Sequence, residues 1–194
     1  MQYPESISSE ELTQLEQIDF TGPIVVVSDM DEEFVEAIDY LRSQEVIGFD
    51  TETKPSFTSN TPRHHVALLQ LSGGDKAYVF RLNMLGLPAP LASLLSDGSI
   101  LKIGAAVKED IRGLMHYRKF TARGFVDLQT MVAEYGITDR SVRKMSAIIL
   151  GKKVSKTQQL SNWEAPQLSG AQLKYAAIDA WVCREMYLKL KSGC

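Results

Sequence analysis

VIGFDTET, residues 46 to 53, is an apolar run followed by two acidic residues that are separated by one threonine. The run Val46-Ile47-Gly48-Phe49 predicts a buried strand, and side chains two apart on a strand point to the same face. We therefore expect Asp50 and Glu52 to face one spot at the end of that strand. Two like charges about 4 Å apart repel by roughly 4 kcal/mol at an effective dielectric constant of about 20. Either one carboxylate holds a proton or a cation lies between the two, and a divalent metal is the more informative hypothesis.

The length and composition of the chain favour one globular domain. With 194 residues, 44% of them hydrophobic, it is long enough for one buried core and too short for two comfortable domains. The formal net charge of -3 argues against binding nucleic acid through a large basic surface, because that mode needs many phosphate contacts. An acidic net charge still permits a small, metal-bridged contact with the end of a nucleic-acid strand.

The cysteines and the N-terminus bear on where the protein works. Cys183 and Cys194 show no paired spacing and no metal-ligand motif, which suits a reducing, cytoplasmic setting. The first residues, MQYPES, lack the basic region and apolar core of a signal peptide. No apolar stretch approaches the ~20 residues of a membrane span, so we expect neither secretion nor membrane insertion.

Hydrophobic patterning predicts an N-terminal extension with a short helix, residues 1–22, followed by a single domain, residues 23–192. In the domain, three strands in an antiparallel meander precede a strand-helix-strand-helix order that adds two parallel strands. This order predicts an α/β fold with a mixed sheet flanked by helices. The expected strands are 24–27, 46–52, 66–71, 77–80, 100–104 and 124–127, and the expected helices are 8–18, 31–41, 91–95, 107–117, 128–135, 141–150 and 169–191.

Two acidic positions later in the chain have a suggestive setting. Asp110 lies in the first turns of a predicted helix that follows a strand, where the backbone dipole favours a negative side chain. From there it can reach the end of the sheet that holds Asp50. Tyr175 and Asp179 are four residues apart and share one face of the last helix. Taken singly, each acid has a structural explanation as a cap, a turn or a solvated helix face.

The order of these acids resembles a known family. The pattern resembles that of the DEDDy 3′–5′ exonucleases of the ribonuclease H-like superfamily. It consists of Asp-x-Glu on a strand, an Asp between a strand and a helix, and Tyr-x-x-x-Asp on a helix. The ribonuclease D and Werner-syndrome exonuclease domains are the most similar members. The likeness runs from about Ile24 to Leu190, and we expect no counterpart of the helical nucleic-acid-binding domain that follows in ribonuclease D. The segments that carry it are FDTET (49–53), VALLQL (66–71), KIG (102–104), SNWE (161–164) and YAAIDA (175–180).

The resemblance implies a ribonuclease H-like fold and a hydrolase that removes mononucleotides from the 3′ end of DNA or RNA. It also implies that Asp50, Glu52, Asp110 and Asp179 hold two divalent ions, Mg²⁺ or Mn²⁺, the metals that hard oxygen ligands favour. One ion activates water, and the other stabilises the departing 3′ oxygen. Tyr175 would orient the attacking water, because a phenol with a pKa of about 10 is a poor base at neutral pH.

Contacts with a single-stranded 3′ end are predicted from position. Thr51, Thr53 and Leu68 or Leu69 lie near the acids, although strand alternation favours a core role for the two leucines. Phe57, in the polar loop that follows, is a candidate to stack on a base. Trp163 is a packing residue in our interpretation. The candidate phosphate-binding cations are Lys54, Arg63, Lys152, Lys153 and Lys156, of which Lys156 is the best because its place ahead of SNWE is family-like.

Two other functions stay open at this point. The chain can be a catalytically silent module that binds nucleic acid or protein, although the intact set of five residues argues against silence. It can also be a phosphodiesterase of short oligonucleotides, which its modest charge suits. Preference for DNA or RNA cannot be read from these residues.

Overall fold

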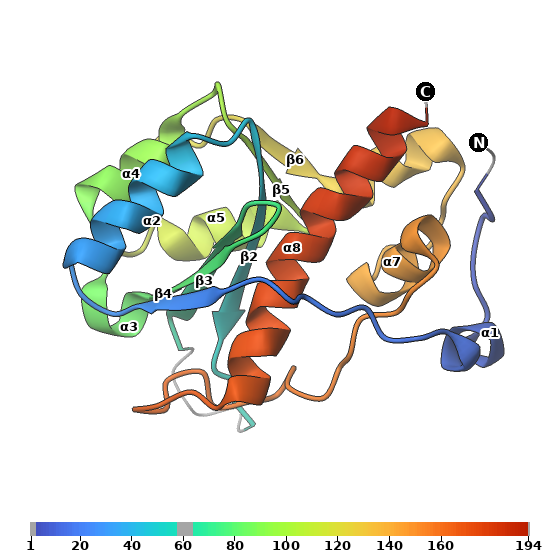
Figure 1. Cartoon of the computed structure of the whole chain (residues 1–194), viewed down its shortest axis with the longest axis horizontal. Helices are drawn as coiled ribbons and strands as arrows, with labels where there is room; N and C mark the ends of the chain where they lie inside the picture. The colour runs from blue at the N-terminus through green and yellow to red at the C-terminus, as the bar shows by residue number, and fades with distance from the viewer. Residues whose placement is uncertain (1–2, 58–63, 194) are drawn as a thin grey trace.

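A mixed sheet of six strands, in the order β1-β4-β3-β2-β5-β6, forms the centre of the molecule (Figure 1). The computed structural model describes residues 3–57 and 64–193. The strands are β1 (Ile24–Val27), β2 (Val46–Thr53), β3 (Val66–Ser72), β4 (Ala77–Arg81), β5 (Leu101–Gly104) and β6 (Phe125–Asp127). The helices are α1 (Ser9–Gln14), α2 (Glu32–Arg42), α3 (Leu82–Leu85), α4 (Ala89–Ser96), α5 (Val107–Leu114), α6 (Leu128–Met131), the 3-10 turn η1 (Val132–Tyr135), α7 (Val142–Leu150) and α8 (Gly170–Ser192).

The sheet confirms the predicted meander and parallel pairs and adds one strand to them. β2, β3 and β4 are antiparallel neighbours, and β5 and β6 run parallel to β2 on its other side. β1 pairs in parallel with β4 at the edge, with Ile24 opposite Ala77. The sequence identified β1 as a strand but not its partner, because four apolar residues carry no information about which edge they join.

Side chains alternate between two helix-covered faces of the sheet. Phe49, Leu69 and Phe80 belong to the core beneath α2, α4 and α5. On the opposite face α8 crosses the sheet diagonally, with α7 beside it (Figure 1). α8 lies very close to β2, because a Cβ at Gly48 would stand 1.9 Å from the carbonyl oxygen of Ala180. Glycine at this position therefore lets α8 approach the strand that carries Asp50 and Glu52.

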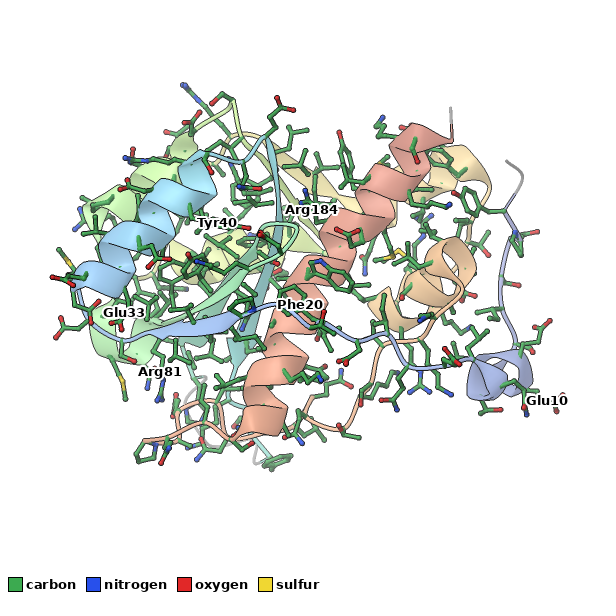
Figure 2. All side chains as sticks on the ribbon, viewed as in Figure 1. Glu10, Phe20, Glu33, Tyr40, Arg81 and Arg184 are labelled. Carbon is green, nitrogen blue, oxygen red and sulfur yellow. The ribbon has the colours of Figure 1, made fainter. Side chains whose placement is uncertain are left out.

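The N-terminal segment packs against the domain after a shorter helix than expected. α1 begins at the predicted capping box and ends at Gln14, after which Leu15 is extended. The segment then pairs with the loop before α8, where the Ile18 amide donates to the Lys153 carbonyl at 2.9 Å. Phe20, labelled in Figure 2, packs on Trp181 of α8 with ring centroids 5.4 Å apart. These contacts, which sequence patterning does not reveal, take the place of the predicted last helical turn; the boundary at residue 22 stays a prediction.

Smaller differences concern helix ends. α5 ends at Leu114 and not at Tyr117, whose hydroxyl donates to the Val66 carbonyl at 2.8 Å. The predicted helix 128–135 is divided into α6 and η1, and α3 was not predicted. α7 and α8 begin where the predicted ranges place them, after the N-caps Ser141 and Ser169. Of the helices within the described ranges, none has the length and apolar character that crossing a membrane requires.

Candidate active site

Three carboxylates converge where β2 ends beneath α8. Asp50 and Glu52 lie on the α8-facing side of β2, as strand alternation predicts, and Asp179 comes from α8. One carboxylate oxygen from each of the three lies within 4.8 Å of the other two. Asp179 is 129 positions further along the chain than Asp50, so their proximity depends on the close packing of α8 on Gly48.

The three acids are held in an environment that disfavours their charges. Burial raises the pKa of Asp50 well above its usual range, and the charges of Asp179, Glu52 and Asp110 raise it further. Burial and the charges of Asp179 and Asp110 raise the pKa of Glu52 to about 9. Burial raises the pKa of Asp179 to about 7, against the hydrogen bond from Tyr175, which lowers it. Oxygen donors crowded in this way fit a divalent cation, which replaces the shared protons.

Asp110 reaches the same end of the sheet from the other face of β2. Its Oδ1 accepts a hydrogen bond of 2.6 Å from the hydroxyl of Thr51, whose side chain points away from Asp50 and Glu52. Burial raises the pKa of Asp110 to about 6, although this hydrogen bond lowers it. Within the described ranges, the only acidic group that could hold an ion consists of Asp50, Glu52 and Asp179. Asp110 is therefore coupled to that group by charge but lies outside it.

Asp127, an acid outside the predicted set, shapes the turn before α5, the helix that carries Asp110. Ala106, just before α5, has a left-handed backbone with φ of 59°. Its amide donates to Asp127 Oδ1 at 3.0 Å, and the same oxygen accepts from the Gln129 amide at 2.9 Å and caps α6. This role of Asp127 was not predicted from the sequence; the signal was an acid at a strand-to-helix junction, the same setting as that of Asp110.

Tyr175 lies one helical turn before Asp179 and faces the three acids. Burial, and then the charges of Asp179 and Glu52, raise the pKa of Tyr175 above its ordinary value, so the phenol stays protonated. Its ring lies 5.9 Å from that of Trp163, centroid to centroid. Trp163 is fully buried, in agreement with its predicted packing role.

A cavity of about 270 Å³ contains the acids and side chains that sequence reasoning did not connect with them. The predicted Lys156 lines it, whereas Ser141, Arg143 and Gln159 were missed. No sequence signal could have found these three, because only the packing of α7 and the loop before α8 brings them to β2. The full lining is Asp50, Glu52, Ser141, Val142, Arg143, Val154, Ser155, Lys156, Gln159, Tyr175 and Asp179.

Thr51 and Thr53 line a second cavity, of about 520 Å³, together with Asp110. Because they alternate with Asp50 and Glu52, they face the opposite side of β2 from the three acids. Three histidines and an arginine complete much of the wall of this cavity. These residues are His64, His65, Arg112 and His116.

The other candidate substrate contacts have varied settings. Phe57 is 78% exposed, so it is accessible for stacking. Leu68 has no exposed surface and packs with Trp163 and Ala176, which corrects its candidacy as a substrate contact and agrees with the core role that alternation favoured; Leu69 is equally buried.

Three of the candidate phosphate-binding cations have partners in the protein. Lys54 pairs with Glu164, Lys152 pairs with Glu16, and Lys153 donates to the Thr13 carbonyl. Arg63 lies outside the described residues.

Comparison with known proteins decides the family. Residues 25–193 match the family model described as 3′–5′ exonuclease. The chain belongs to this family. Membership of the 3′–5′ exonuclease family confirms the resemblance that the acidic pattern predicted, and the fold agrees with it.

Relatives of the exonuclease family show the extent of the similarity. The chain is 37% identical over 149 residues to exonuclease 3′–5′ domain-containing protein 2 of Drosophila melanogaster, covering 75% of this chain and 25% of the relative. It is 26% identical over 170 residues to ribonuclease D of Gluconacetobacter diazotrophicus, covering 87% of this chain and 42% of the relative. The crystal structure of the Aedes aegypti Nibbler EXO domain has the same fold, with a TM-score of 0.78, 24% identity, and coverage of 92% of this chain and 91% of that one. The chain thus spans less than half the length of these two curated relatives.

Proposed function

We propose that this chain is a divalent-metal-dependent 3′–5′ exonuclease that hydrolyses the last phosphodiester bond of a DNA or RNA strand and releases mononucleotides. The observation that carries the proposal is the group formed by Asp50, Glu52 and Asp179, with oxygens within 4.8 Å of one another beside Tyr175. Membership of the exonuclease family supports the reaction class. A silent binding module has no need of three crowded carboxylates whose repulsion opposes folding.

The three crowded carboxylates fit a divalent cation, and we propose a pair of Mg²⁺ or Mn²⁺ ions. In our proposal Asp50, Glu52 and Asp179 hold one ion, and Asp110 joins Asp50 in holding the second. Asp110 Oδ1 accepts a hydrogen bond from Thr51 in this structure, and binding of an ion would replace that hydrogen bond. When bound, such ions supply acidity to the attacking water and stabilise negative charge on the leaving 3′ oxygen.

Tyr175 is proposed to orient the attacking water. Its hydroxyl hydrogen-bonds Asp179, and its raised pKa keeps the proton on the phenol. A protonated phenol can hold a water molecule in line with the phosphorus but cannot take its proton at neutral pH. Packing on Trp163 restricts the ring, so the hydroxyl oxygen has a defined position.

We propose that the 3′ end of the nucleic-acid strand enters the site along the end of β2. Thr51 and Thr53 line the cavity on one side, and Lys156 lines the acid-containing cavity on the other. Phe57, exposed beside β2, is proposed to stack on a base. Hydroxyls and one lysine suit the sugar and phosphate of a short single-stranded end, and they make no distinction between bases.

A ladder assay tests the proposal. Single-stranded DNA and RNA of matched sequence, labelled at the 5′ end, are incubated with the wild-type chain and Mg²⁺ or Mn²⁺. We expect stepwise shortening from the 3′ end that EDTA stops and that Asp179→Asn abolishes. Wild-type protein that leaves both strands intact with either metal would refute the proposal in favour of a silent module. Rapid turnover of a dinucleotide with none of a long strand would instead identify a short-oligonucleotide phosphodiesterase.

A further inference from the structure

The cavity that holds the three acids also contains two cations, Arg143 and Lys156. Arg143 is half-buried in the first turn of α7, directly after the Ser141 cap. Its Nε is buried and has no hydrogen-bond partner. By contrast, the Nε of the half-buried Arg184 donates to the Val46 carbonyl at 3.0 Å. Throughout residues 3–57 and 64–193, no ion pair with the Arg143 guanidinium is found.

Arg143 is not the counter-ion of the acids beside it. Across the described ranges, no ion pair or hydrogen bond joins the Arg143 guanidinium to Asp50, Glu52 or Asp179, and its buried Nε has no partner. The guanidinium therefore lies in the same cavity without neutralising its acids. A buried N–H with no protein partner is costly unless a ligand accepts its hydrogen bond.

A phosphate is the ligand that this arrangement suits. A nucleic-acid strand that reaches the acids brings one negative charge per phosphate into a cavity that already holds three carboxylates. A cation at the wall offsets that repulsion for the phosphate next to it. A planar guanidinium binds two phosphate oxygens at once, which a lysine cannot do. Arg143 comes from α7, whereas the three acids come from β2 and α8, so we expect it to meet a neighbour of the phosphate that is cleaved.

We propose that Arg143 is a substrate-binding residue that holds the phosphate preceding the scissile one, with Lys156 as the second cation of the same cavity. The inference rests on the proposed exonuclease function and assigns it a requirement: the strand must carry at least one phosphate beyond the bond that is cleaved. It gives α7 a part in strand binding, in addition to its packing on α8.

Arg143→Met is the test, because methionine keeps the apolar stem and removes the charge. Hydrolysis of a single-stranded oligonucleotide is measured over a range of salt concentrations. We expect KM to rise about tenfold, the loss of one charge-assisted contact, with kcat little changed. The slope of log(kcat/KM) against log[salt] should become shallower by about 0.7, one phosphate contact on a single strand. Mn²⁺ binding, followed by electron paramagnetic resonance, should match that of the wild type.

Arg140→Met is the matched control. Arg140 is exposed, lies three positions before Arg143 and does not line the cavity, so the same change of charge should leave KM and the salt slope at their wild-type values. Arg143→Lys keeps the positive charge but not the planar fork, and should recover part of the lost affinity.

An uncharged methylphosphonate in the substrate tests the contact without any change to the protein. Placed at the phosphate preceding the scissile bond, it should raise KM of the wild-type chain about tenfold and that of Arg143→Met very little. Equal losses in the two proteins, or an unchanged KM and salt slope in Arg143→Met, would overturn the inference and leave the exonuclease proposal standing. A variant that loses Mn²⁺ binding would overturn it too, because Arg143 would then support the metal site. A wild-type chain that degrades no strand refutes the proposed function itself.

Discussion

Asp179→Asn is predicted to stabilise the metal-free protein and to remove its response to divalent ions. In the folded chain an oxygen of Asp179 lies within 4.8 Å of oxygens of Asp50 and Glu52. Two like charges at about 4.8 Å repel by roughly 3 kcal/mol at an effective dielectric constant of about 20. Proton sharing among the acids reduces this, so we expect a gain of about 2 kcal/mol. For a chain of this size, that gain is a rise in Tm of about 4 to 8 °C.

The effect should grow with pH. An acid whose pKa is raised in the folded state binds more protons folded than unfolded, so stability falls as pH rises from the ordinary pKa to the raised one. With the pKa of Glu52 at about 9 and that of Asp179 at about 7, through burial first, the wild-type chain loses stability between about pH 4 and pH 9. Asp179→Asn removes part of this loss. The two proteins should therefore be similar near pH 4 and differ most near pH 8.

Scanning calorimetry in EDTA at several pH values measures the difference, and addition of Mg²⁺ or Mn²⁺ then completes the test. Metal should raise the Tm of the wild type at pH 8 and leave that of Asp179→Asn almost unchanged, because the ion has lost a ligand. Asp39→Asn, at an exposed position on α2, is the control and should lie within about 0.5 kcal/mol of the wild type at every pH. A metal-free Asp179→Asn that is no more stable than the wild type at pH 8 would refute the electrostatic reasoning.

Further substitutions probe the other parts of the fold. Tyr175→Phe should keep the packing on Trp163, the Tm and the binding of Mn²⁺ but lower kcat about 100-fold in the ladder assay; near-normal kcat would contradict the orienting role. Asp127→Ala removes the hydrogen bonds from the amides of Ala106 and Gln129, so urea titration should show a loss of about 1 to 2 kcal/mol of unfolding free energy, and activity should fall. Adding Ala106→Gly should restore part of the stability and part of the activity, because glycine adopts the left-handed backbone of residue 106 without strain. No rescue would argue against the turn as the cause. Burial lowers the pKa of Lys102 from 10.5 to about 8, so between these values the unfolded chain binds more protons and stability should rise with pH. Above pH 9, where the loss from Glu52 is complete, Lys102→Met should lack that rise in thermal scans up to about pH 10, and an equal rise in both proteins would exclude Lys102 as its source.

Several features of the site were accessible from sequence because they depend on local periodicity. Asp50 and Glu52 share a face because the period of a strand is two, and Tyr175 and Asp179 share a face because residues four apart are neighbours on a helix. The predicted starts of the last two helices, at 141 and 169, coincide with the N-caps Ser141 and Ser169, because a polar residue there precedes an apolar helical run. Each of these inferences needs only a few consecutive residues.

Features that depend on how elements pack were not accessible in the same way. Thr51 and Asp110 were both candidate site residues, but the sequence did not show that Thr51 holds Asp110 on the face of β2 opposite Asp50. Leu68 is buried beneath α8, so its position beside the acids in sequence does not make it a surface residue. Arg143 enters the cavity only because α7 packs on α8.

The sequence alone determined which strand carries the paired acids, which helix carries the tyrosine and third acid, and the family to which the pattern belongs. The tertiary structure decided which of the four acids lie within 4.8 Å of one another, where β1 joins the sheet, and which cations reach the cavity. The physical reason is range: strand and helix periods act over a few residues, whereas the approach of α8 to Gly48 depends on side chains far apart in the chain that fill one core together.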